Sequence, residues 1–219
     1  MLEELWPEIG KAWVTVVLAG GGSILVQWLA PKAARLLRRL RATRHPRLER
    51  RLAAMLAADV VGYARLMSAD EEGTHRRLVT YRREIIDPQV RQYCGRIVKN
   101  TGDGALVEFG SVVDAVRCAL EMQGRLRARN AQLPQSRRIE FRIGVNLGDV
   151  IVAPDDIYGH GVNLAARLEG LAPPGGICIS ADAWRHVRGV IAAEFVDLGE
   201  QRLKNIDDPA HVFAIAPAA

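Results

Sequence analysis

The stretch RIVKNTGDGALVEF, residues 96–109, decides the fold class of this chain. Two largely apolar segments, residues 96–100 and 105–109, flank a short turn in which Gly102 and Gly104 surround Asp103. Glycine permits the backbone angles that tight turns require. The pattern therefore predicts a β-hairpin with Asp103 at its tip.

A strand and a helix are predicted upstream of this hairpin. The apolar run Met55–Val61 indicates a buried strand. Ser68 followed by Glu71 suggests a capping box at the start of a helix, and apolar residues then recur at helical spacing as far as Pro88. Proline is expected to end that helix.

Downstream of the hairpin the pattern continues with a helix and a strand. Ser111 begins the second helix, and IEFRIGV, residues 139–145, alternates as a half-buried strand does. The order βαββαβ is that of the ferredoxin-like split arrangement, so we predict an α+β palm core within residues 51–219. A C-terminal extension is expected to add a strand near Val150, a helix over about residues 161–170, the strand GICIS, a short helix around Trp184, and strands near Leu203 and Phe213.

The N-terminal part predicts a membrane anchor. After a short segment, residues 1–11, residues 12–30 carry no charge and would form a helix of roughly 28 Å, enough to cross a bilayer. Trp13 and Trp28 lie near its ends, and a basic helical linker, residues 31–50, follows. The alternatives are a buried core helix and a signal peptide, whose basic residues would precede the apolar run. We expect a single pass through a cell inner membrane, with the following domain in the cytoplasm.

The charge of the chain argues against a nucleic-acid partner. The formal net charge is +5, but residues 32–51 alone contain nine Lys or Arg and one acid, which leaves −3 for the rest of the 219 residues. A mildly acidic domain lacks the basic surface that nucleic-acid binding requires. The three cysteines form no C-x-x-C pair and are expected to be reduced thiols.

Two aspartates are candidate metal ligands. Asp59 ends the first predicted strand, and the hairpin that carries Asp103 is the neighbour of that strand in a βαββαβ sheet. Two carboxylates at one point repel each other unless a cation lies between them. Mg²⁺ is typically held by one or two carboxylates together with substrate phosphates, which suggests a two-metal phosphoryl-transfer site. An ordinary turn aspartate is the alternative for each.

Four further polar residues are candidates for substrate binding. Asn163 and Arg167 are four residues apart and share one helical face, where an amide and a guanidinium suit a ribose and a phosphate. Lys99 lies in an apolar strand, and Asp156 lies in the loop sequence APDDIYG. A solvated helix face and ordinary surface charges are the alternatives.

Five segments in one order resemble the catalytic domain of class III adenylyl cyclases: AADVVGYARLM, IVKNTGDGALVEF, FRIGVNLGDVIV, DIYGHGVNLAARLE and QRLKNIDDPAHVF. The resemblance covers about residues 51–215, and an ordered set of five motifs is far more specific than any one of them. It implies that Asp59 and Asp103 bind two divalent ions, Mg²⁺ or Mn²⁺, with the carbonyl of Val60 as an additional ligand. It also implies that the turn through Gly62 and Tyr63 meets the triphosphate.

The same resemblance implies roles for residues of the second half of the site. Lys99 and Asp156 correspond to the pair that recognises the purine. Asn163 corresponds to the residue that orients the ribose, and Arg167 to the one that stabilises the transition state. Lys204 corresponds to a triphosphate-binding lysine, although this chain has LKN where the family often has LKG.

The choice of purine also follows from hydrogen-bond chemistry. Adenine offers an amine donor at position six and an acceptor at N1, and guanine reverses both. Ionised Asp156 can only accept and Lys99 can only donate, so the pair complements adenine and favours ATP over GTP. The chain is thus expected to be an adenylate cyclase that makes 3′,5′-cyclic AMP and pyrophosphate. A guanylyl or relaxed-specificity cyclase is the alternative, and guanylyl cyclases of this type usually have Glu and Cys at these two positions.

Class III cyclases place each active site between two subunits, with the metal-binding aspartates on one and the purine, ribose and phosphate residues on the other. Because this chain carries both sets, the resemblance implies a homodimer with two competent sites. A catalytically silent nucleotide-sensing or dimerisation module is the alternative, against which the complete residue set argues. A diguanylate cyclase is excluded because the chain lacks a GGDEF run.

Overall fold

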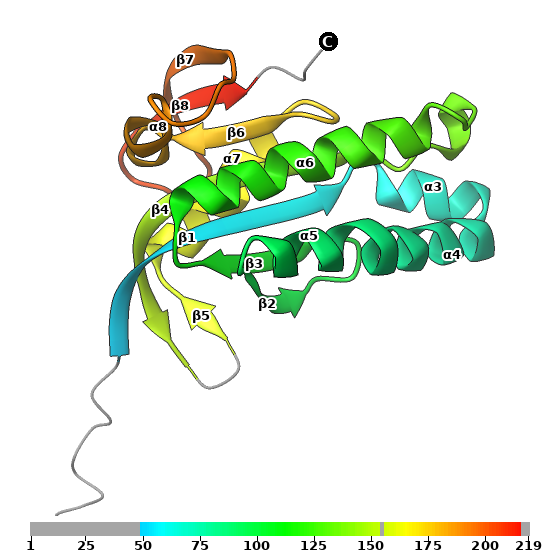
Figure 1. Ribbon diagram of the computed structural model, residues 1–219, viewed down its shortest axis with the longest axis horizontal. Helices are drawn as coiled ribbons and strands as arrows, with labels where there is room; N and C mark the ends of the chain where they lie inside the picture. Colours follow the sequence, from blue (N-terminus) through cyan, green and yellow to red (C-terminus); the bar gives the residue numbers. More distant parts are fainter. Residues whose placement is uncertain (1–48, 154–155, 216–219) are drawn as a thin grey trace, which may run out of the picture. The chain divides into compact units, whose positions relative to one another are not determined.

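The structure, a computed structural model, describes residues 49–153 and 156–215 (Figure 1). The predicted membrane span, the segment before it and the linker as far as residue 48 lie outside the described residues. Within the described ranges, every helix is too short or too polar to cross a membrane. The first strand already begins at Glu49, so the last two residues expected in the helical linker belong to the sheet instead.

The described residues form alternating strands and helices. In chain order they are β1 (Glu49–Val60), α3 (Tyr63–Ala69), α4 (Glu71–Tyr81), η1 (Arg82–Ile86), α5 (Asp87–Gln92), β2 (Arg96–Asn100), β3 (Ala105–Phe109), α6 (Val112–Asn130), η2 (Gln135–Arg137), β4 (Phe141–Val152), β5 (Ile157–Tyr158), α7 (His160–Leu171), β6 (Ile177–Ser180), α8 (Ala181–Val187), β7 (Phe195–Gln201) and β8 (Ala210–Ile215). This sequence of elements contains the predicted βαββαβ core followed by a C-terminal extension.

The strands form one sheet in the order β2-β3-β1-β4-β6-β8-β7, with β5 paired to β4. Strand β1 runs antiparallel to both β3 and β4, and β6 is parallel to β4. The β2-β3-β1-β4 order confirms the predicted ferredoxin-like core. It also places the end of β1 between the hairpin turn and the beginning of β4, which is where the candidate carboxylates lie.

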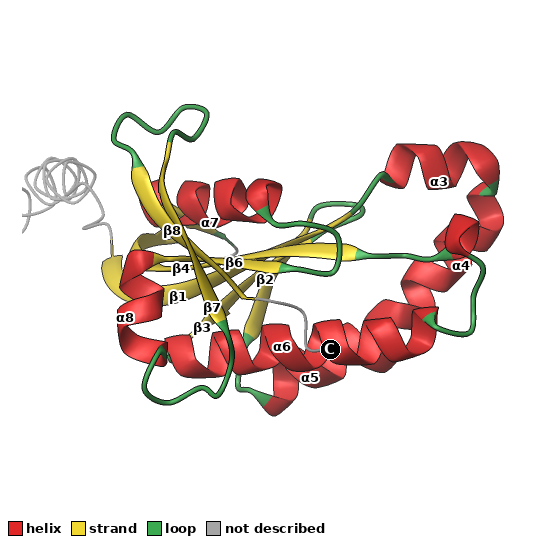
Figure 2. Ribbon diagram, turned by 90° about the horizontal axis from the view of Figure 1, so that it is seen from above, coloured by secondary structure: helices red, strands yellow, loops and turns green. Residues whose placement is uncertain are grey.

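Helices cover both faces of the sheet (Figure 2). Helices α4, α5, α6 and α8 lie against one face, and α7 lies against the other. Successive side chains of β1 point alternately into these two helical layers, because side chains alternate between the two faces of a sheet along a strand. Leu56 packs in the cluster beneath α6, and Met55 packs with Leu106 and Ala165 of α7. The long buried β1 therefore ties the two layers together at the centre of the sheet.

The helical segment after β1 differs from the sequence prediction at both ends. Asp70, and not Ser68, is the N-cap of α4, because its side chain accepts the Gly73 amide while the Ser68 hydroxyl bonds back to Ala64. The helix also does not end at Pro88. Proline there has no amide hydrogen to donate, and the chain passes through a π-helical turn, η1, before continuing as α5.

Two further predictions at the C-terminal side were wrong. The strand expected near Val150 is not separate, because β4 runs without a break from Phe141 to Val152. The strand expected near Leu203 ends two residues earlier, at Gln201, and Leu203 is buried in the loop that follows. By contrast, Ser111 is the N-cap of α6, and its hydroxyl accepts the Asp114 amide, as predicted.

Candidate active site

The hairpin turn brings Asp103 close to Asp59 at the end of β1. Burial of Asp59 raises the pKa of its carboxyl, and the negative charge of Asp103 raises that pKa further. The approach depends on Gly104, because a Cβ atom there would overlap the Ala58 carbonyl oxygen and would lie 3.2 Å from Asp59 Oδ1. Only glycine leaves enough space at position 104, and its small size lets the carboxylates of Asp59 and Asp103 lie close together.

Replacement of Gly104 by alanine should consequently disturb the site from within. The new methyl group would collide with backbone, which cannot rotate away, so we expect a loss of about 1–3 kcal/mol in the free energy of unfolding, measured by urea denaturation. Gly110→Ala, where a Cβ atom has nothing within 4 Å, is the matched control and should change stability by less than about 0.5 kcal/mol. Equal effects of the two substitutions would contradict this explanation of Gly104.

Two charged residues that the sequence did not single out also face Asp59. Arg142 lies directly opposite Asp59 in the β1–β4 register, and its Nη2 atom lies 3.3 Å from Asp59 Oδ2. The Nε atom of Arg142 lies 3.1 Å from Glu169 Oε1 on α7. Burial raises the pKa of Glu169 to about 7, with Arg142 opposing this shift and the charges of Asp59 and Asp103 adding to it. A mixed group of three acids and one arginine thus surrounds the end of β1.

The packing of α7 explains why Glu169 reaches this point. Gly144 of β4 lies directly beneath the helix, and a Cβ atom at this position would overlap the Ala165 carbonyl oxygen and the Glu169 amide. The absence of a side chain lets α7 pack against the sheet at backbone distance. Glu169 is consequently held over β4 beside Arg142.

The donor set at the end of β1 fits a divalent cation. Two carboxylates that repel each other adjoin the backbone of buried Val60, and oxygen ligands of this kind suit Mg²⁺ or Mn²⁺. Within residues 49–153 and 156–215 there is no cluster of three or more His, Cys, Asp or Glu side chains arranged for a metal. Because Mg²⁺ prefers octahedral coordination, phosphate and water oxygens would complete the shell that the two carboxylates and the carbonyl begin.

The turn after Val60 begins a helix. Gly62 has φ +63°, in the left-handed region, and is the N-cap of α3, whose first residue is Tyr63. The first amides of a helix have no acceptor within the helix, and they attract anions. The geometry of this turn is thus compatible with the phosphate contact that the motif implies.

The structure brings Lys99 and Asp156 together. Lys99 Nζ donates to Asp156 Oδ2 at 2.8 Å and lies 5.9 Å from the centre of the Tyr158 ring. A β-bulge between Ile97 and Lys99 changes the register of β2 just before this lysine. The hydrogen bond from Lys99 lowers the pKa of Asp156, so the acid is ionised at neutral pH. Lys99 and Asp156 therefore form an ion pair within one chain.

Helix α7 presents the second group of predicted residues. Asn163 is exposed in its first half, and Arg167 follows one turn later. The Nε atom of Arg167 donates to the backbone carbonyl of Lys204 at 2.8 Å. Asn205 has φ +61°, a conformation that glycine and asparagine adopt most readily, which explains how LKN can replace LKG. The structure therefore places the Lys204 backbone beside Arg167 and accommodates asparagine at position 205.

Residues 49–215 match the family model described as the adenylate and guanylate cyclase catalytic domain. This chain belongs to that family. It is 49% identical over 170 residues to a Rhizobium meliloti protein named "Putative adenylate cyclase 3", an alignment that covers 78% of this chain and 29% of the relative. A Streptomyces coelicolor protein named adenylate cyclase is 32% identical over 132 residues, or 60% of this chain and 33% of the relative. The chain thus spans about a third or less of these relatives.

Solved structures agree with the family. An adenylate/guanylate cyclase/hydrolase from Silicibacter pomeroyi superposes with a TM-score of 0.72 at 46% identity, covering 78% of this chain and 99% of that one. The guanylyl cyclase Cya2 superposes with a TM-score of 0.66 at 26% identity, covering 78% and 95%. The described part of this chain therefore has the mixed α+β palm fold of class III cyclases.

In this cyclase domain the candidate residues fall into two groups. Within the described ranges, no hydrogen bond or ion pair joins the cluster around Asp59 to the Lys99–Asp156 pair or to Arg167. Arg167 and Glu169 are two residues apart on α7, so they point to roughly opposite sides of the helix. The geometry of one chain thus separates the candidate metal ligands, here called the metal group, from the candidates for nucleotide binding, here called the recognition group.

Proposed function

We propose that this chain is an adenylate cyclase that converts ATP to 3′,5′-cyclic AMP and pyrophosphate at sites shared by two copies of the chain. The observation that carries this proposal is the Lys99–Asp156 pair, whose 2.8 Å hydrogen bond lies beside the exposed ring of Tyr158. An ionised acid and a lysine at one point offer adenine an acceptor for its amine and a donor for N1. Guanine would leave both groups mismatched, at a cost of about 1–3 kcal/mol for each unpaired buried group.

The metal group would act on the phosphates. Asp59, Asp103 and the Val60 carbonyl would hold two Mg²⁺ or Mn²⁺ ions, which when bound supply activation of the ribose 3′-hydroxyl and neutralisation of phosphate charge. Arg142 adds a guanidinium beside Asp59, so a positive charge is present there whether the carboxylates are protonated or ionised. The amides near Gly62 and Tyr63 would contact the triphosphate.

The recognition group would act on the same nucleotide from the other copy. Asn163 would orient the ribose, and Arg167 would offset the negative charge that grows on the α-phosphoryl group. The hydrogen bond from Arg167 to the Lys204 carbonyl keeps the loop that carries Lys204 near the Arg167 guanidinium. The Lys204 side chain is then available to bind phosphate. Most of the catalysis would be positioning and electrostatic stabilisation.

The separation of the two groups within one chain supports a homodimer. Each copy would give its metal group to one site and its recognition group to the other, so a symmetric dimer would have two complete sites and a monomer none. We also propose that residues 12–30 anchor the chain in a cell inner membrane, with the catalytic domain in the cytoplasm. The uncharged span and the basic residues that follow it support this topology.

A guanylyl cyclase is the second candidate, because a guanylyl cyclase is among the similar structures. The purified chain should be assayed with ATP and with GTP in the presence of Mn²⁺, both intact and without its first 44 residues. We expect cyclic AMP from ATP, and a rate with GTP at least about tenfold lower in both forms, as expected for one or more unpaired polar groups. Only the intact form should sediment with membranes.

The double variant Lys99→Glu with Asp156→Cys tests the purine specificity in the opposite direction. It exchanges the donor and acceptor pattern without touching the metal group, so it should move the preference towards GTP. Equal rates with the two nucleotides in the wild type would contradict the proposed purine recognition. Full recovery of the intact chain in the soluble fraction would contradict the anchor.

A further inference from the structure

The hairpin turn that carries Asp103 is attached to the helical layer by one side chain. Arg82, the first residue of η1, extends its guanidinium to the turn, and its Nη2 atom donates to the carbonyl oxygens of Gly102 and Gly104, each at 2.8 Å. Hydrogen bonds from a charged donor are stronger than those from neutral groups. Arg82 therefore holds the turn on both sides of Asp103.

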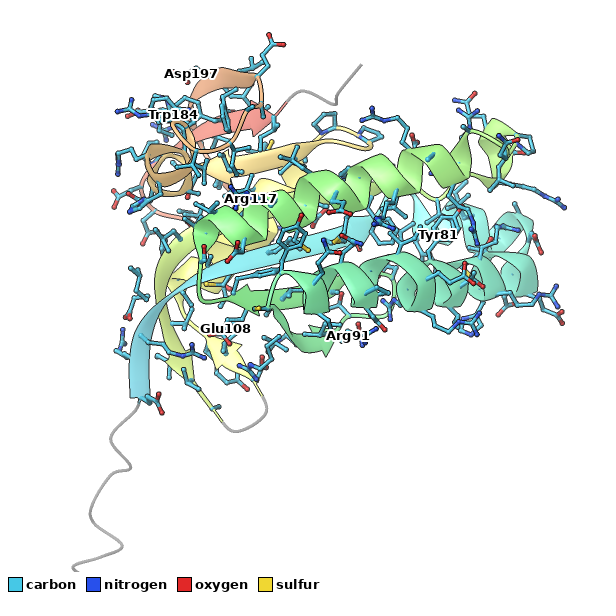
Figure 3. The ribbon with its side chains drawn as sticks, in the orientation of Figure 1. Tyr81, Arg91, Glu108, Arg117, Trp184 and Asp197 are labelled. Atoms are coloured by element: carbon cyan, nitrogen blue, oxygen red, sulfur yellow. The ribbon has the colours of Figure 1, made fainter. Side chains whose placement is uncertain are left out.

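The π-helical turn accounts for the position of Arg82. Pro88 cannot donate a backbone hydrogen bond, and the ladder is re-formed with a wider spacing, in which the Asp87 amide donates to the Arg82 carbonyl five residues earlier. The preceding residue, Tyr81, is buried, and its hydroxyl donates to Asn130 of α6 at 3.1 Å. Figure 3 shows Tyr81 between α4 and α6. The backbone that carries Arg82 is thus fixed by the core.

The turn itself has little intrinsic rigidity. Thr101 and Gly102 are exposed, and Gly102 has φ +89°. Across the turn, one backbone hydrogen bond joins the Thr101 amide to the Gly104 carbonyl at 2.9 Å. Glycines lose much conformational freedom when they are ordered, so an external contact is needed to restrict such a turn. Within the part of the chain that the structure describes, the bonds from Arg82 are the side-chain contacts that supply this restriction.

We propose that Arg82 is a positioning residue of the cyclase reaction, which fixes the turn so that Asp103 stands ready to bind metal opposite Asp59. This inference rests on the proposed role of Asp103 as a metal ligand. Arg82 does not touch the reacting atoms in this arrangement. Its effect arises because a ligand must be held within a fraction of an ångström for tight coordination, and a turn free to move would bind the ion more weakly.

The test compares three variants of the full chain: Arg82→Met, Arg82→Lys and Arg83→Met. Methionine keeps much of the length of the arginine stem but cannot donate. Lysine can donate from one nitrogen to both carbonyls, as Arg82 Nη2 does. Arg83 is the neighbouring exposed arginine and pairs only with adjacent Glu84 among the described residues, so it is the matched control.

Two quantities are measured: the Mn²⁺ concentration that gives half-maximal cyclase activity at saturating nucleotide, and amide hydrogen exchange of residues 101–104 without metal. For Arg82→Met we expect the half-saturating Mn²⁺ concentration to rise about tenfold and exchange of the turn to accelerate, as the loss of two hydrogen bonds requires. Arg82→Lys should restore at least part of both, and Arg83→Met should resemble the wild type.

An unchanged Mn²⁺ dependence in a folded Arg82→Met protein, or equal changes in Arg83→Met, would overturn the proposal. If Arg82→Met does not fold, Arg82→Lys tests the proposal in its place. A wild-type Mn²⁺ dependence together with wild-type exchange of residues 101–104 supports the proposal. A weakened Mn²⁺ dependence with unchanged exchange of these residues overturns it. Failure of the proposed function is distinguishable, because the wild type would then make no cyclic nucleotide. The exchange of residues 101–104 would still report whether Arg82 holds the turn.

Discussion

Replacement of Asp103 by asparagine is expected to lower the rate of cyclic nucleotide formation by about 1000-fold or more, with the fold preserved. Asparagine keeps the size of the side chain but removes the negative charge that would bind the metal ions. A loss of this size corresponds to about 4 kcal/mol in the activation free energy. Asp103 is a cleaner choice than Asp59, because Asp59 also forms an ion pair with Arg142, which its substitution would remove.

The same variant should be more stable than the wild type when metal is removed by a chelator. Burial and the charge of Asp103 raise the pKa of Asp59, so the folded state binds that proton more strongly than the unfolded state. The contribution of Asp59 to stability is therefore greatest at low pH and is lost as the pH rises through its folded-state pKa. Asp103→Asn relieves part of the repulsion and should reduce this loss.

Urea denaturation of both proteins at acidic and neutral pH measures this difference, and a steady-state assay measures the rate. The wild type and the variant should converge in stability at low pH, where Asp59 is protonated in both. An active Asp103→Asn protein would contradict the metal role of this carboxylate. A variant that is inactive because it is unfolded is recognised in the same denaturation series, and Asp103→Glu then replaces it.

Co-expression of two inactive chains should restore activity. Asp59→Ala removes a proposed metal ligand, and Arg167→Ala removes the group proposed to stabilise the transition state, so each homodimer should be inactive. In a mixed dimer both defects fall in one site and the other site is complete. Random pairing makes half of the dimers mixed, with one intact site each, so we expect about a quarter of wild-type activity per chain.

Distinct affinity tags on the two chains allow the mixed dimer to be purified and assayed alone. The control pairs Asp59→Ala with Asp103→Asn, which belong to the same half of the site and should not restore activity together. No rescue in a folded mixed dimer of Asp59→Ala and Arg167→Ala would contradict the shared-site arrangement. Rescue in the control pair would contradict the assignment of both aspartates to one group.

The order of the core elements followed from the sequence because each part carries a strong local signal. The glycines of the hairpin turn, the apolar run of β1 and the alternation of β4 decide structure over short distances. The end of the helical segment was wrong because proline need not end a helix when the ladder can widen into a π turn. The capping box was wrong because Ser68 still belongs to α3, where its hydroxyl donates to the Ala64 carbonyl, and Asp70 caps α4 instead.

Only some residues of the candidate site could be predicted from the sequence. Arg142 was missed because a charged residue in an alternating strand is typical of a solvent-facing position. The predicted topology nonetheless held the signal, since antiparallel pairing of the end of β1 with the start of β4 places Arg142 opposite Asp59. Glu169 and Arg82 had no such local signal. Both reach the site through the packing of whole helices, which depends on Gly144 and on the π turn near Pro88.

The product formed by the wild-type chain tests the proposed adenylate cyclase activity most directly. Folded protein, separated by size so that the dimer is assayed alone, should be incubated with ATP and Mn²⁺, and the products identified by mass spectrometry. We expect 3′,5′-cyclic AMP and pyrophosphate in equal amounts, formed by the dimer and lost when the metal is chelated. Folded dimer that makes no cyclic AMP from ATP with metal present would contradict the proposed activity.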